Sequence, residues 1–536
     1  MRFPPTHKLV RLFLALGLAG ALIPAAPAGA TQPDSGQQRN YPEFTFERVR
    51  VEMRDGVNLS VDLWRPVTPK NVRVPVILTL TPYHSLYYAL DPRETDLPSG
   101  DARLLVPKGY AYAQADVRGT WNSGGCWNYG GLKERQDGYD LVEWLGTREW
   151  SNGKVAMTGG SYDGTTANAA AVENPPHLAT IIPVSAISRW WGYAYQQGTR
   201  SSYSGESADI DPPSDTPTDF MFAYGFLPPP EPGALTDAEQ IAMRWTPCER
   251  VEQTLHGYDT EPDYDAFWRQ RDYLRLAHKV KVPVLVAHGL LDFNVKTWEG
   301  TAWYQALRSE KAMVIGQWPH ANPRSYWSEW DGLLERWLER WLYGVHNGVE
   351  DEPSVHVQTN DKQWHTQNDW GDPDLTAFGI EGDTFEYLDD GSLTESEMLR
   401  VGSGGADRFV RVEVPRTSGI RLQGRPVLRL EASASQVSTH FVAVLLDVSK
   451  TGQTQVISRA FLNGRYKDGL TKGKDLEPGK ATTFDLEFID KDWIVAPDHH
   501  LELLIASSSN SWVFPDEQRS NNTLFLKRSR LLLPVR

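Results

Sequence analysis

The sequence predicts an α/β domain followed by an all-β domain, and three observations support this division. Apolar strand-like runs alternate with helix-like segments over residues 31–350, which is typical of a mostly parallel sheet covered on both faces. The alternation breaks over about 188–279, a stretch rich in Trp, Tyr, Pro and Asp that is interpreted as an inserted helical cap. Residues 351–536 consist of short alternating segments separated by Gly, Ser, Asn and Asp, which predict a β-sandwich or jelly roll.

Residues 1–30 have the three parts of a secretory signal peptide. Lys8 and Arg11 precede an apolar run over residues 12–23, and a small-residue cleavage site, Ala28-Gly29-Ala30, follows it. The run is short for a membrane span, although a non-cleaved anchor is the alternative. We therefore expect a secreted protein whose mature form has no membrane segment.

The composition argues against several classes of partner. The formal net charge of −15 disfavours binding to nucleic acid or to an anionic membrane surface. No Cys/His cluster has the spacing of a zinc site, so we expect neither a catalytic metal nor another cofactor. The two cysteines, Cys126 and Cys248, could form a disulfide after export, but the sequence leaves this pairing open. It also leaves open whether the protein forms a homo-oligomer.

The first half of the α/β domain can be followed element by element. Residues 44–64 alternate apolar and polar side chains around Asp55-Gly56, which predicts an antiparallel hairpin. Buried strands are expected over Val74–Leu80 and Tyr110–Asp116, and a helix over Arg135–Leu145.

The alternation of strand-like and helix-like segments resumes after the cap. Strands are predicted over Val282–Ala287 and Lys311–Ile315, and helices over Trp298–Leu307 and Leu333–Leu342. Strands and helices on either side of residues 188–279 would therefore belong to one sheet.

A sharp glycine turn carries a candidate nucleophile. Val155–Thr158 reads as a short buried strand, and Thr165–Val172 reads as a helix of small residues. Between them, Ser161 follows Gly159-Gly160 directly. A strand, a tight turn bearing a serine and then a helix form the nucleophile elbow of an α/β-hydrolase.

The elbow departs from the usual pattern in one respect. Its second glycine, Gly164, stands three residues after Ser161 instead of two. A Gly-Ser loop between two core elements is the alternative, so the assignment depends on residues further along the chain.

Two downstream residues complete a catalytic constellation. Asp292 follows the strand predicted at Val282–Ala287, and His320 follows the next strand. The order Ser161, Asp292, His320 is the order expected of an α/β-hydrolase, with each residue at the carboxyl end of a strand. An imidazole is needed to take the serine proton, and a carboxylate to orient the imidazole. The neighbouring His288 is expected to pack beside the loop that carries Asp292, which is called the acid loop.

Two groups are candidates for the oxyanion hole. The backbone N–H of Tyr162 directly follows the nucleophile, and Tyr83 follows the strand predicted at Val74–Leu80. The Tyr83 hydroxyl could donate to the developing negative charge, or it could be an ordinary buried phenol; position alone favours neither.

These segments together resemble the Xaa-Pro dipeptidyl-peptidase and cocaine-esterase-like hydrolases. The matching blocks cover nearly the whole mature chain: Thr81–Tyr83, Asp116–Thr120, Trp150–Lys154, Gly159–Gly164, His288–Asp292 and Pro319–His320. The resemblance implies an α/β-hydrolase domain with an inserted cap and a C-terminal jelly roll. It also implies the triad Ser161, Asp292 and His320, with Tyr83 and the Tyr162 amide as the oxyanion hole.

The resemblance also implies a site for the substrate's amino group. The aromatic block Ile187–Tyr195 looks like the opening of the cap in Xaa-Pro peptidases, and Gly205–Asp209 looks like the acidic segment after it. This maps the ammonium-binding carboxylate onto Glu206, with Tyr193 as helper and Trp190 among the aromatic residues around the proline ring. The alternatives are that Asp209 or Asp211 binds the amino group instead, or that this segment is only a solvated acidic loop.

The function expected from these residues is that of a secreted serine peptidase releasing Xaa-Pro dipeptides from small peptides with a free N-terminus. An esterase, or an acylase acting on α-amino esters or β-lactams, would use the same triad. A carbohydrate- or wall-binding protein with an inactive hydrolase core is a third hypothesis, which the intact triad disfavours.

Overall fold

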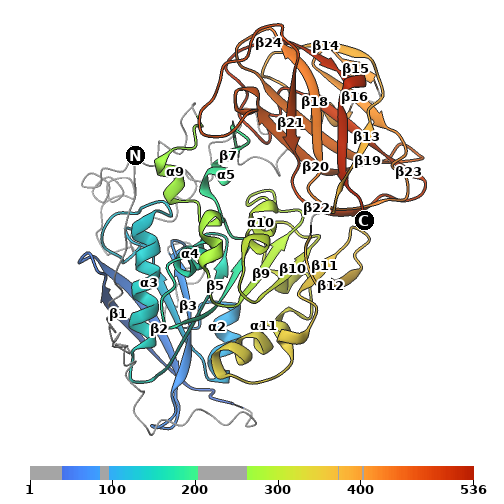
Figure 1. Ribbon diagram of the computed structural model, residues 1–536. Helices are drawn as coiled ribbons and strands as arrows, with labels where there is room; N and C mark the ends of the chain where they lie inside the picture. Colours follow the sequence, from blue (N-terminus) through green and yellow to red (C-terminus); the bar gives the residue numbers. More distant parts are fainter. Residues whose placement is uncertain (1–38, 85–95, 203–261, 372, 401–403) are drawn as a thin grey trace, which may run out of the picture.

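The structure is a computed structural model that describes residues 39–84, 96–202, 262–371, 373–400 and 404–536. It has an α/β domain, drawn blue to yellow in Figure 1, and a β domain, drawn orange to red. None of the helices in these ranges is long and apolar enough to cross a membrane. The expected signal peptide lies outside the described residues.

One ten-stranded sheet organises the α/β domain, in the order β1-β2-β4-β3-β5-β6-β9-β10-β11-β12. The strands from β4 to β11 in this order run parallel, and β1, β2 and β12 are antiparallel to their neighbours. Their bounds are β1 Phe44–Glu52, β2 Asn58–Pro66, β3 Val74–Thr81, β4 Ala111–Asp116, β5 Ser151–Gly160, β6 Leu178–Val184, β9 Val284–Gly289, β10 Lys311–Gly316, β11 Val355–Gln358 and β12 Trp364–Gln367.

Helices cover both faces of this sheet, as the alternation of strands and helices predicts. Strand β3 divides its side chains between the two faces, since Leu78 belongs to one buried cluster and Ile77 to the other. The first cluster includes residues of α3, α4 and α10, and the second includes residues of α2 and α11. These helices are α2 Gly100–Leu105, α3 Leu132–Gly146, α4 Tyr162–Ala171, α10 Trp298–Ala306 and α11 Trp330–Leu338.

The first sheet extends further along the chain than the sequence indicates. The sequence pattern predicts a domain boundary at residue 350, but β11 pairs in parallel with β10 and β12 pairs with β11. The α/β sheet therefore continues to Gln367. Short alternating segments look alike in either domain, and only the pairing partner shows where a strand belongs.

The interruption between β6 and β9 lies mostly outside the described residues, so the expected helical cap over 188–279 is seen only at its two ends. These ends contain α5 Trp190–Ala194, the short strands β7 Tyr195–Gln196 and β8 Thr199–Arg200, α9 Ala266–Gln270 and a 3₁₀ helix at Leu274–Lys279.

Cys126 is disulfide-bonded. The sequence has one other cysteine, Cys248, whose position is not described.

The β domain is built from two larger antiparallel sheets, one of six strands and one of five. Their inward-facing residues, such as Leu430 of β18 and Ala443 of β19, form one buried cluster, so the sheets pack as a sandwich. The elements are β13 Leu375–Gly379, β14 Thr384–Asp389, α12 Glu395–Arg400, β15 Gly404–Ala406, β16 Phe409–Val414, β17 Arg421–Gly424, β18 Val427–Ala434, β19 His440–Ser449, β20 Thr454–Asn463, β21 Thr482–Glu487, β22 Lys491–Ile494, β23 His499–Ala506, β24 Ser520–Phe525 and β25 Arg530–Pro534.

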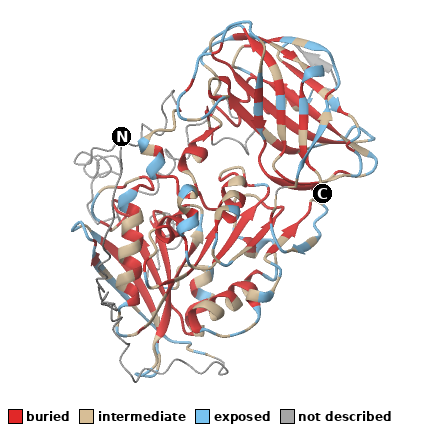
Figure 2. Cartoon of the chain, viewed as in Figure 1, coloured by how far each residue is buried: buried red, intermediate tan, exposed pale blue. Residues whose placement is uncertain are grey.

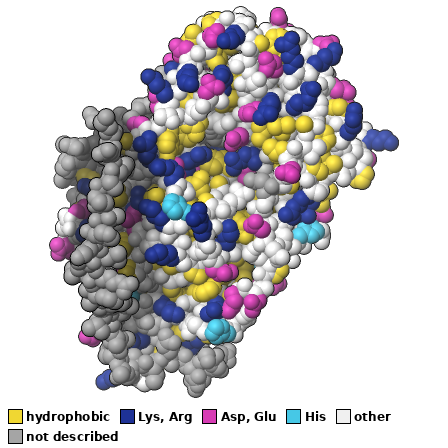
Figure 3. All heavy atoms as spheres, in the orientation of Figure 1, with side chains coloured by type: hydrophobic (Ala, Val, Ile, Leu, Met, Phe, Trp, Pro, Cys, Tyr) yellow, Lys and Arg dark blue, Asp and Glu magenta, His cyan; other side chains and the backbone are white. Residues whose placement is uncertain are grey.

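Burial follows this architecture closely. Figure 2 shows the central strands of both domains largely buried, with exposed positions in edge strands and connections. On the face seen in Figure 3, Lys and Arg side chains lie among Asp and Glu side chains over both domains.

Candidate active site

Ser161 occupies a strained turn between β5 and α4. Its backbone has φ 59° and ψ −120°, a conformation that residues with a side chain rarely adopt. The Ser161 N–H donates to the Val184 carbonyl at 2.9 Å, and its carbonyl accepts from the Thr165 N–H at 2.9 Å. Strain of this kind costs about 1–3 kcal/mol and persists where surrounding contacts impose it, which is typical of a nucleophile elbow.

The displaced glycine of the elbow has a packing reason. A Cβ atom on Gly164 would lie 2.7 Å from the Gly159 carbonyl oxygen and 3.0 Å from the Val184 backbone nitrogen. A Cβ on Gly159 would lie 2.3 Å from that of Asp163. Because α4 starts this close to β5 and β6, glycine is required at the third position after Ser161.

The structure brings Asp292 and His320 together. Asp292 follows β9 and His320 follows β10, and the Nδ1 atom of His320 lies 2.7 Å from Oδ2 of Asp292. The other carboxylate oxygen, Oδ1, accepts from the N–H groups of Asn294 at 3.0 Å and Val295 at 2.9 Å. With Nδ1–H donating to Asp292, the Nε2 atom of His320 is left to act as a base.

The surroundings keep Asp292 ionised. Burial, the largest influence, acts to raise its pKa, but the charge and hydrogen bond of His320 bring the pKa below the ordinary aspartate value. His288 approaches the same carboxylate oxygen, with Nε2 3.5 Å from Oδ2 of Asp292 and 2.8 Å from the Val295 carbonyl. Burial lowers the pKa of His288, which favours its neutral form. His288 thus packs beside the acid loop, as the sequence predicts.

A buried lysine donates hydrogen bonds to backbone carbonyls of the acid loop. The Nζ atom of Lys296 donates to the carbonyls of Phe293 at 2.6 Å and Asn294 at 3.2 Å. Burial lowers the pKa of Lys296 to about 8, although the charge of Asp292 acts in the opposite direction. Lys296 is not recognisable from the sequence, since a lysine four positions after an aspartate has no distinctive pattern.

Tyr83 and the Tyr162 amide meet beside the serine. The Tyr83 hydroxyl lies 3.3 Å from Oγ of Ser161, and the Tyr162 N–H donates to the same hydroxyl at 3.3 Å. Both donors therefore face the position next to Oγ, where the oxyanion of a tetrahedral intermediate would form.

A buried His–Asp pair supports the loop that carries Tyr83. The Tyr83 N–H donates to Oγ1 of Thr81 at 3.0 Å, and Nδ1 of the following residue, His84, lies 2.8 Å from Oδ1 of Asp116. Burial alone would lower the pKa of His84, but the hydrogen bond and charge of Asp116 raise it above the usual histidine value. Asp116 stands at the end of β4, a position that could have marked it in the sequence.

The side chain of Tyr162, the residue after the nucleophile, is held by two buried hydrogen bonds. Its hydroxyl donates to Oε2 of the buried Glu134 at 2.5 Å and accepts from the Trp127 indole N–H at 2.7 Å. Glu134 also accepts from the Asn128 N–H at 2.8 Å. Glu134 lies in α3, and no pattern in the sequence indicates its hydrogen bond with Tyr162.

The two aromatic residues expected in the substrate site differ in their surroundings. Tyr193 is half-buried, and its hydroxyl donates to Oδ1 of Asn294 in the acid loop at 2.9 Å. Trp190 is fully buried, packs edge-on against Tyr193 and donates its indole N–H to the Tyr273 hydroxyl at 2.9 Å. The structure thus places Tyr193 at the acid loop and Trp190 behind it, as a support.

The proposed ammonium-binding residue cannot be located. Glu206, and the alternatives Asp209 and Asp211, lie outside the described residues. Within the described part of the chain, no group of three or more His, Cys, Asp or Glu side chains could hold a metal ion.

Comparison with known proteins gives family matches over most of the chain. Residues 55–322 match the family model of the X-Pro dipeptidyl-peptidase (S15 family), and residues 347–531 match the X-Pro dipeptidyl-peptidase C-terminal non-catalytic domain. A Bacillus cereus protein named as a candidate Xaa-Pro dipeptidyl-peptidase is 27% identical over 532 residues, covering 89% of this chain and 86% of that protein. The Xaa-Pro dipeptidyl-peptidase of Ligilactobacillus salivarius is 29% identical over 306 residues, covering 52% and 36% of the two chains.

Solved structures share the fold. An α-amino acid ester hydrolase superimposes with a TM-score of 0.73 at 19% identity, covering 97% of this chain and 100% of that one. A CocE/NonD family hydrolase from Staphylococcus aureus superimposes with a TM-score of 0.73 at 17% identity, covering 92% and 94%. The chain is therefore a serine hydrolase with an α/β-hydrolase fold, and it belongs to the X-Pro dipeptidyl-peptidase (S15) family.

Proposed function

We propose that this protein is an exported serine peptidase that releases Xaa-Pro dipeptides from peptides with a free N-terminus. The observation that carries the proposal is the 2.7 Å contact between His320 and Asp292, at the sheet edge where the strained Ser161 meets the Tyr83 hydroxyl. Membership of the S15 family supports the choice of substrate.

The reaction starts with attack by Oγ of Ser161 on the carbonyl carbon that follows proline. Nε2 of His320 takes the serine proton as the new C–O bond forms. The negative charge that develops on the carbonyl oxygen accepts hydrogen bonds from Tyr83 and from the Tyr162 amide. The C–N bond then breaks, and His320 gives its proton to the departing amine.

Water completes the cycle on the acyl-enzyme. His320 takes a proton from the water molecule, the hydroxide attacks the ester carbonyl, and the proton returns to Oγ of Ser161 as the dipeptide leaves. Asp292 remains ionised throughout, holds the Nδ1–H of His320 and stabilises the imidazolium that forms in each half of the cycle.

The substrate's ammonium group sets the position of cleavage. A carboxylate that binds the free amine two residues before the scissile bond makes the enzyme measure a dipeptide, and we assign this role to Glu206. Tyr193 contacts the acid loop through Asn294 and would line the same side of the site. Aromatic residues of the cap would enclose the proline ring.

Two chromogenic substrates test this proposal directly. Ala-Pro p-nitroanilide offers a free amine and a scissile amide, and p-nitrophenyl acetate offers only a simple ester. We expect efficient cleavage of the anilide, none after N-acetylation of the substrate, and none by the Ser161→Ala variant. Cleavage of the ester without the anilide would show an esterase or an amino-ester acylase instead.

The third hypothesis, a binding protein with an inactive core, is tested with a fluorophosphonate probe. An active triad labels Ser161, and an inactive one leaves the protein unlabelled. Export is tested separately, by N-terminal sequencing of protein from the culture medium, which we expect to start after residue 30.

A further inference from the structure

The C-terminal β domain contacts both loops that carry the proposed base and acid. The contacts come from one short segment, Asp490–Asp492, where the chain enters β22. This segment lies between the two domains in Figure 1. The matching family describes this domain as non-catalytic, so its contacts with the site need a separate explanation.

Lys491 makes the first contact, with the acid loop. Its Nζ atom donates a hydrogen bond to the carbonyl of Leu290, two residues before Asp292. The Leu290 N–H in turn donates to the Gly316 carbonyl at 2.7 Å, at the end of β10. The ammonium of Lys491 thus holds the start of the acid loop where it joins the next strand.

Asp492 makes the second contact, with the histidine loop. Its backbone carbonyl accepts from Nε2 of Gln317 at 2.9 Å, three residues before His320. The same amide of Gln317 donates to the Gln358 carbonyl at 3.2 Å, so it links β11 to the β domain.

Neighbouring contacts reinforce the same segment. The side chain of Asp490 accepts from the Thr301 hydroxyl in α10 and pairs with Nε of Arg425 at 2.7 Å. Phe293 of the acid loop packs against a small buried cluster of the β domain that includes Trp512 and Phe461. The C-terminal domain therefore contacts the acid loop at Leu290 and Phe293, and α10 at Thr301.

Lys491 stands out because its position is costly. The residue is 5% exposed, and burial together with the positive charge of Arg459 lowers its pKa to about 7, against the opposing charges of Asp292 and Asp490. An apolar side chain of similar length would avoid this desolvation. Retaining a cation here is explained if its hydrogen bond and its charge serve the neighbouring site.

We propose that Lys491 is a positioning residue for catalysis, which holds the acid loop so that the Asp292 carboxylate meets Nδ1 of His320. Gln317 does the same for the histidine loop through the Asp492 carbonyl. The C-terminal domain is in this sense a part of the catalytic apparatus. The inference rests on the proposed roles of Asp292 and His320, and the experiment below separates the two.

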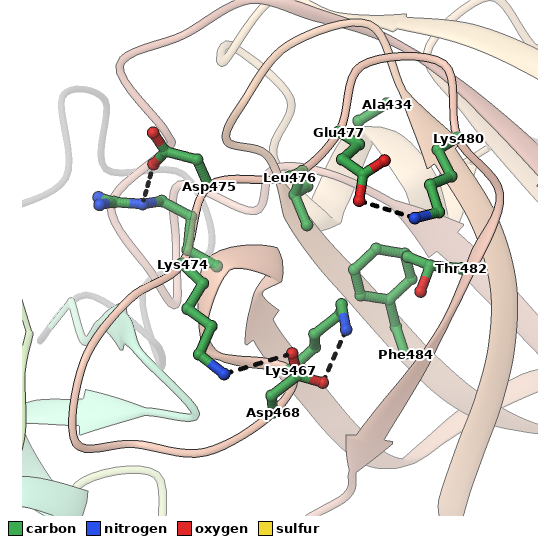
Figure 4. Close-up of a pocket in the computed structure, with 11 residues that line it drawn as sticks. Ala434, Lys467, Asp468, Lys474, Asp475, Leu476, Glu477, Lys480, Thr482 and Phe484 are labelled. Carbon is green, nitrogen blue, oxygen red and sulfur yellow. Dashed lines mark hydrogen bonds and ion pairs between the residues drawn. The ribbon is translucent and has the colours of Figure 1, made fainter.

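Other lysines of the β domain provide the contrast. A surface pocket of the β domain has a volume of about 240 Å³. Figure 4 shows Lys467 and Lys474 facing Asp468 at this pocket, and Lys480 facing Glu477. The Lys480–Glu477 pair, with Nζ 2.7 Å from Oε1, is exposed and lies within one domain. The contacts of Lys491 with Leu290 and of Gln317 with Asp492 are called the clamp. Lys480→Met removes one positive charge, as Lys491→Met does, and leaves the clamp intact.

Destabilisation of the β domain needs its own control. Phe484 is fully buried beside the same pocket and packs on Phe441 with ring centroids 4.6 Å apart. Phe484→Leu loosens the core of this domain without touching either active-site loop. It shows what a purely structural defect does to the kinetics.

The test compares Lys491→Met and Gln317→Met with these two controls, in the full-length protein, on whichever of the two chromogenic substrates the wild type cleaves. We expect both clamp variants to lower kcat by about tenfold to a hundredfold with KM within about twofold, since a small misplacement of a catalytic group has this effect. Both controls should retain the wild-type kcat.

The pH profile supplies a readout that a structural defect would not move. The charge of Lys491 interacts with those of Asp292, Arg459 and Asp490, and it lowers the pKa of His288. By the same repulsion we expect Lys491 to disfavour a second positive charge on His320, beside Asp292. Its removal should therefore shift the acid limb of kcat/KM to higher pH, whereas Phe484→Leu should leave that limb in place.

The outcomes separate cleanly. A kcat within about twofold of wild type in both clamp variants would overturn the inference, and so would an unmoved acid limb or an equal loss in Phe484→Leu. Gln317→Met decides the kcat comparison if Lys491→Met does not fold. A wild-type protein that cleaves neither substrate contradicts the proposed function itself, whatever the clamp does.

Discussion

The hydroxyl of Tyr83 lies 3.3 Å from Oγ of Ser161, on the side where the Tyr162 amide also points. The amide donates to the tyrosine hydroxyl, and that hydroxyl donates to the serine oxygen. Because the serine oxygen accepts this hydrogen bond, the serine proton takes no part in it, and we expect Nε2 of His320 to take that proton. In the proposed mechanism, substrate binding redirects both donors from this chain to the oxyanion, so we expect the oxyanion hole to be assembled before the reaction starts.

Removing the Tyr83 hydroxyl should therefore slow the chemical step. Tyr83→Phe is expected to lower kcat by about a hundredfold or more with little change in KM, the usual effect of losing one oxyanion donor. Steady-state kinetics on the anilide measure it. Tyr110→Phe is the matched control, because the buried Tyr110 hydroxyl has no hydrogen-bond partner among the described residues. Equal losses in both variants would contradict the oxyanion role.

The Asp292 carboxylate should matter through the state of His320. Asp292→Asn replaces an acceptor of the Nδ1–H by an amide, which favours the wrong tautomer and removes the charge that stabilises the imidazolium. We expect kcat to fall by about a thousandfold or more while the protein still folds. Asp485→Asn, in the exposed pair with Arg429, should have no effect on kcat. A loss of only a few fold in Asp292→Asn would show that another group orients the base.

Glu299 should make stability depend on pH. It accepts from the Ser188 N–H at 2.7 Å, the Ser188 hydroxyl at 2.6 Å and the Arg189 N–H at 2.8 Å, and so anchors the entry to the cap. Burial raises its pKa from 4.5 to about 7, against the opposing effects of Ser188 and Arg189. The folded state therefore binds the proton more tightly than the unfolded state, and this contribution to stability declines as the pH rises from about 4.5 to about 7.

Glu299→Gln removes that titration. Thermal unfolding measured between pH 4 and pH 8 should show the variant gaining stability relative to wild type as the pH rises, with the gap constant above about pH 7. The exposed Glu477→Gln serves as the control. Parallel curves for wild type and Glu299→Gln would refute the assignment.

Loss of the proposed ammonium-binding carboxylate should affect substrates with a free amine and spare substrates that have none. Glu206→Gln should cripple cleavage of Ala-Pro p-nitroanilide, whose free amine it would bind, and should spare p-nitrophenyl acetate. Asp209→Asn is the neighbouring control, and a selective loss there would move the role to that residue. An equal loss on both substrates in Glu206→Gln would exclude the anchoring role.

Much of the fold is predictable because buried strands and glycine turns have local patterns. The strand expected at Val74–Leu80 is observed at Val74–Thr81, and the elbow at Ser161 is marked by the residue types its geometry requires. The order of the serine, acid and histidine could be read because each follows a strand, and parallel strands expose their carboxyl ends at one edge.

What could not be predicted depends on partners far apart in the chain. The strand β11, at Val355–Gln358, joins the first sheet through pairing with β10, which no local pattern indicates. Glu134 reaches Tyr162 across 28 positions, and Lys491 reaches Leu290 across 201. A buried charge with a distant partner looks in the sequence like an ordinary surface residue.

The central claim is that Ser161 releases a dipeptide ending in proline from a free N-terminus. Mass spectrometry of a synthetic peptide beginning Ala-Pro, incubated with the full-length protein, tests it most directly. We predict an Ala-Pro dipeptide and the shortened peptide with wild type, and neither with Ser161→Ala or with the N-acetylated peptide. An intact peptide after incubation with a wild-type enzyme that a fluorophosphonate labels at Ser161 would contradict it.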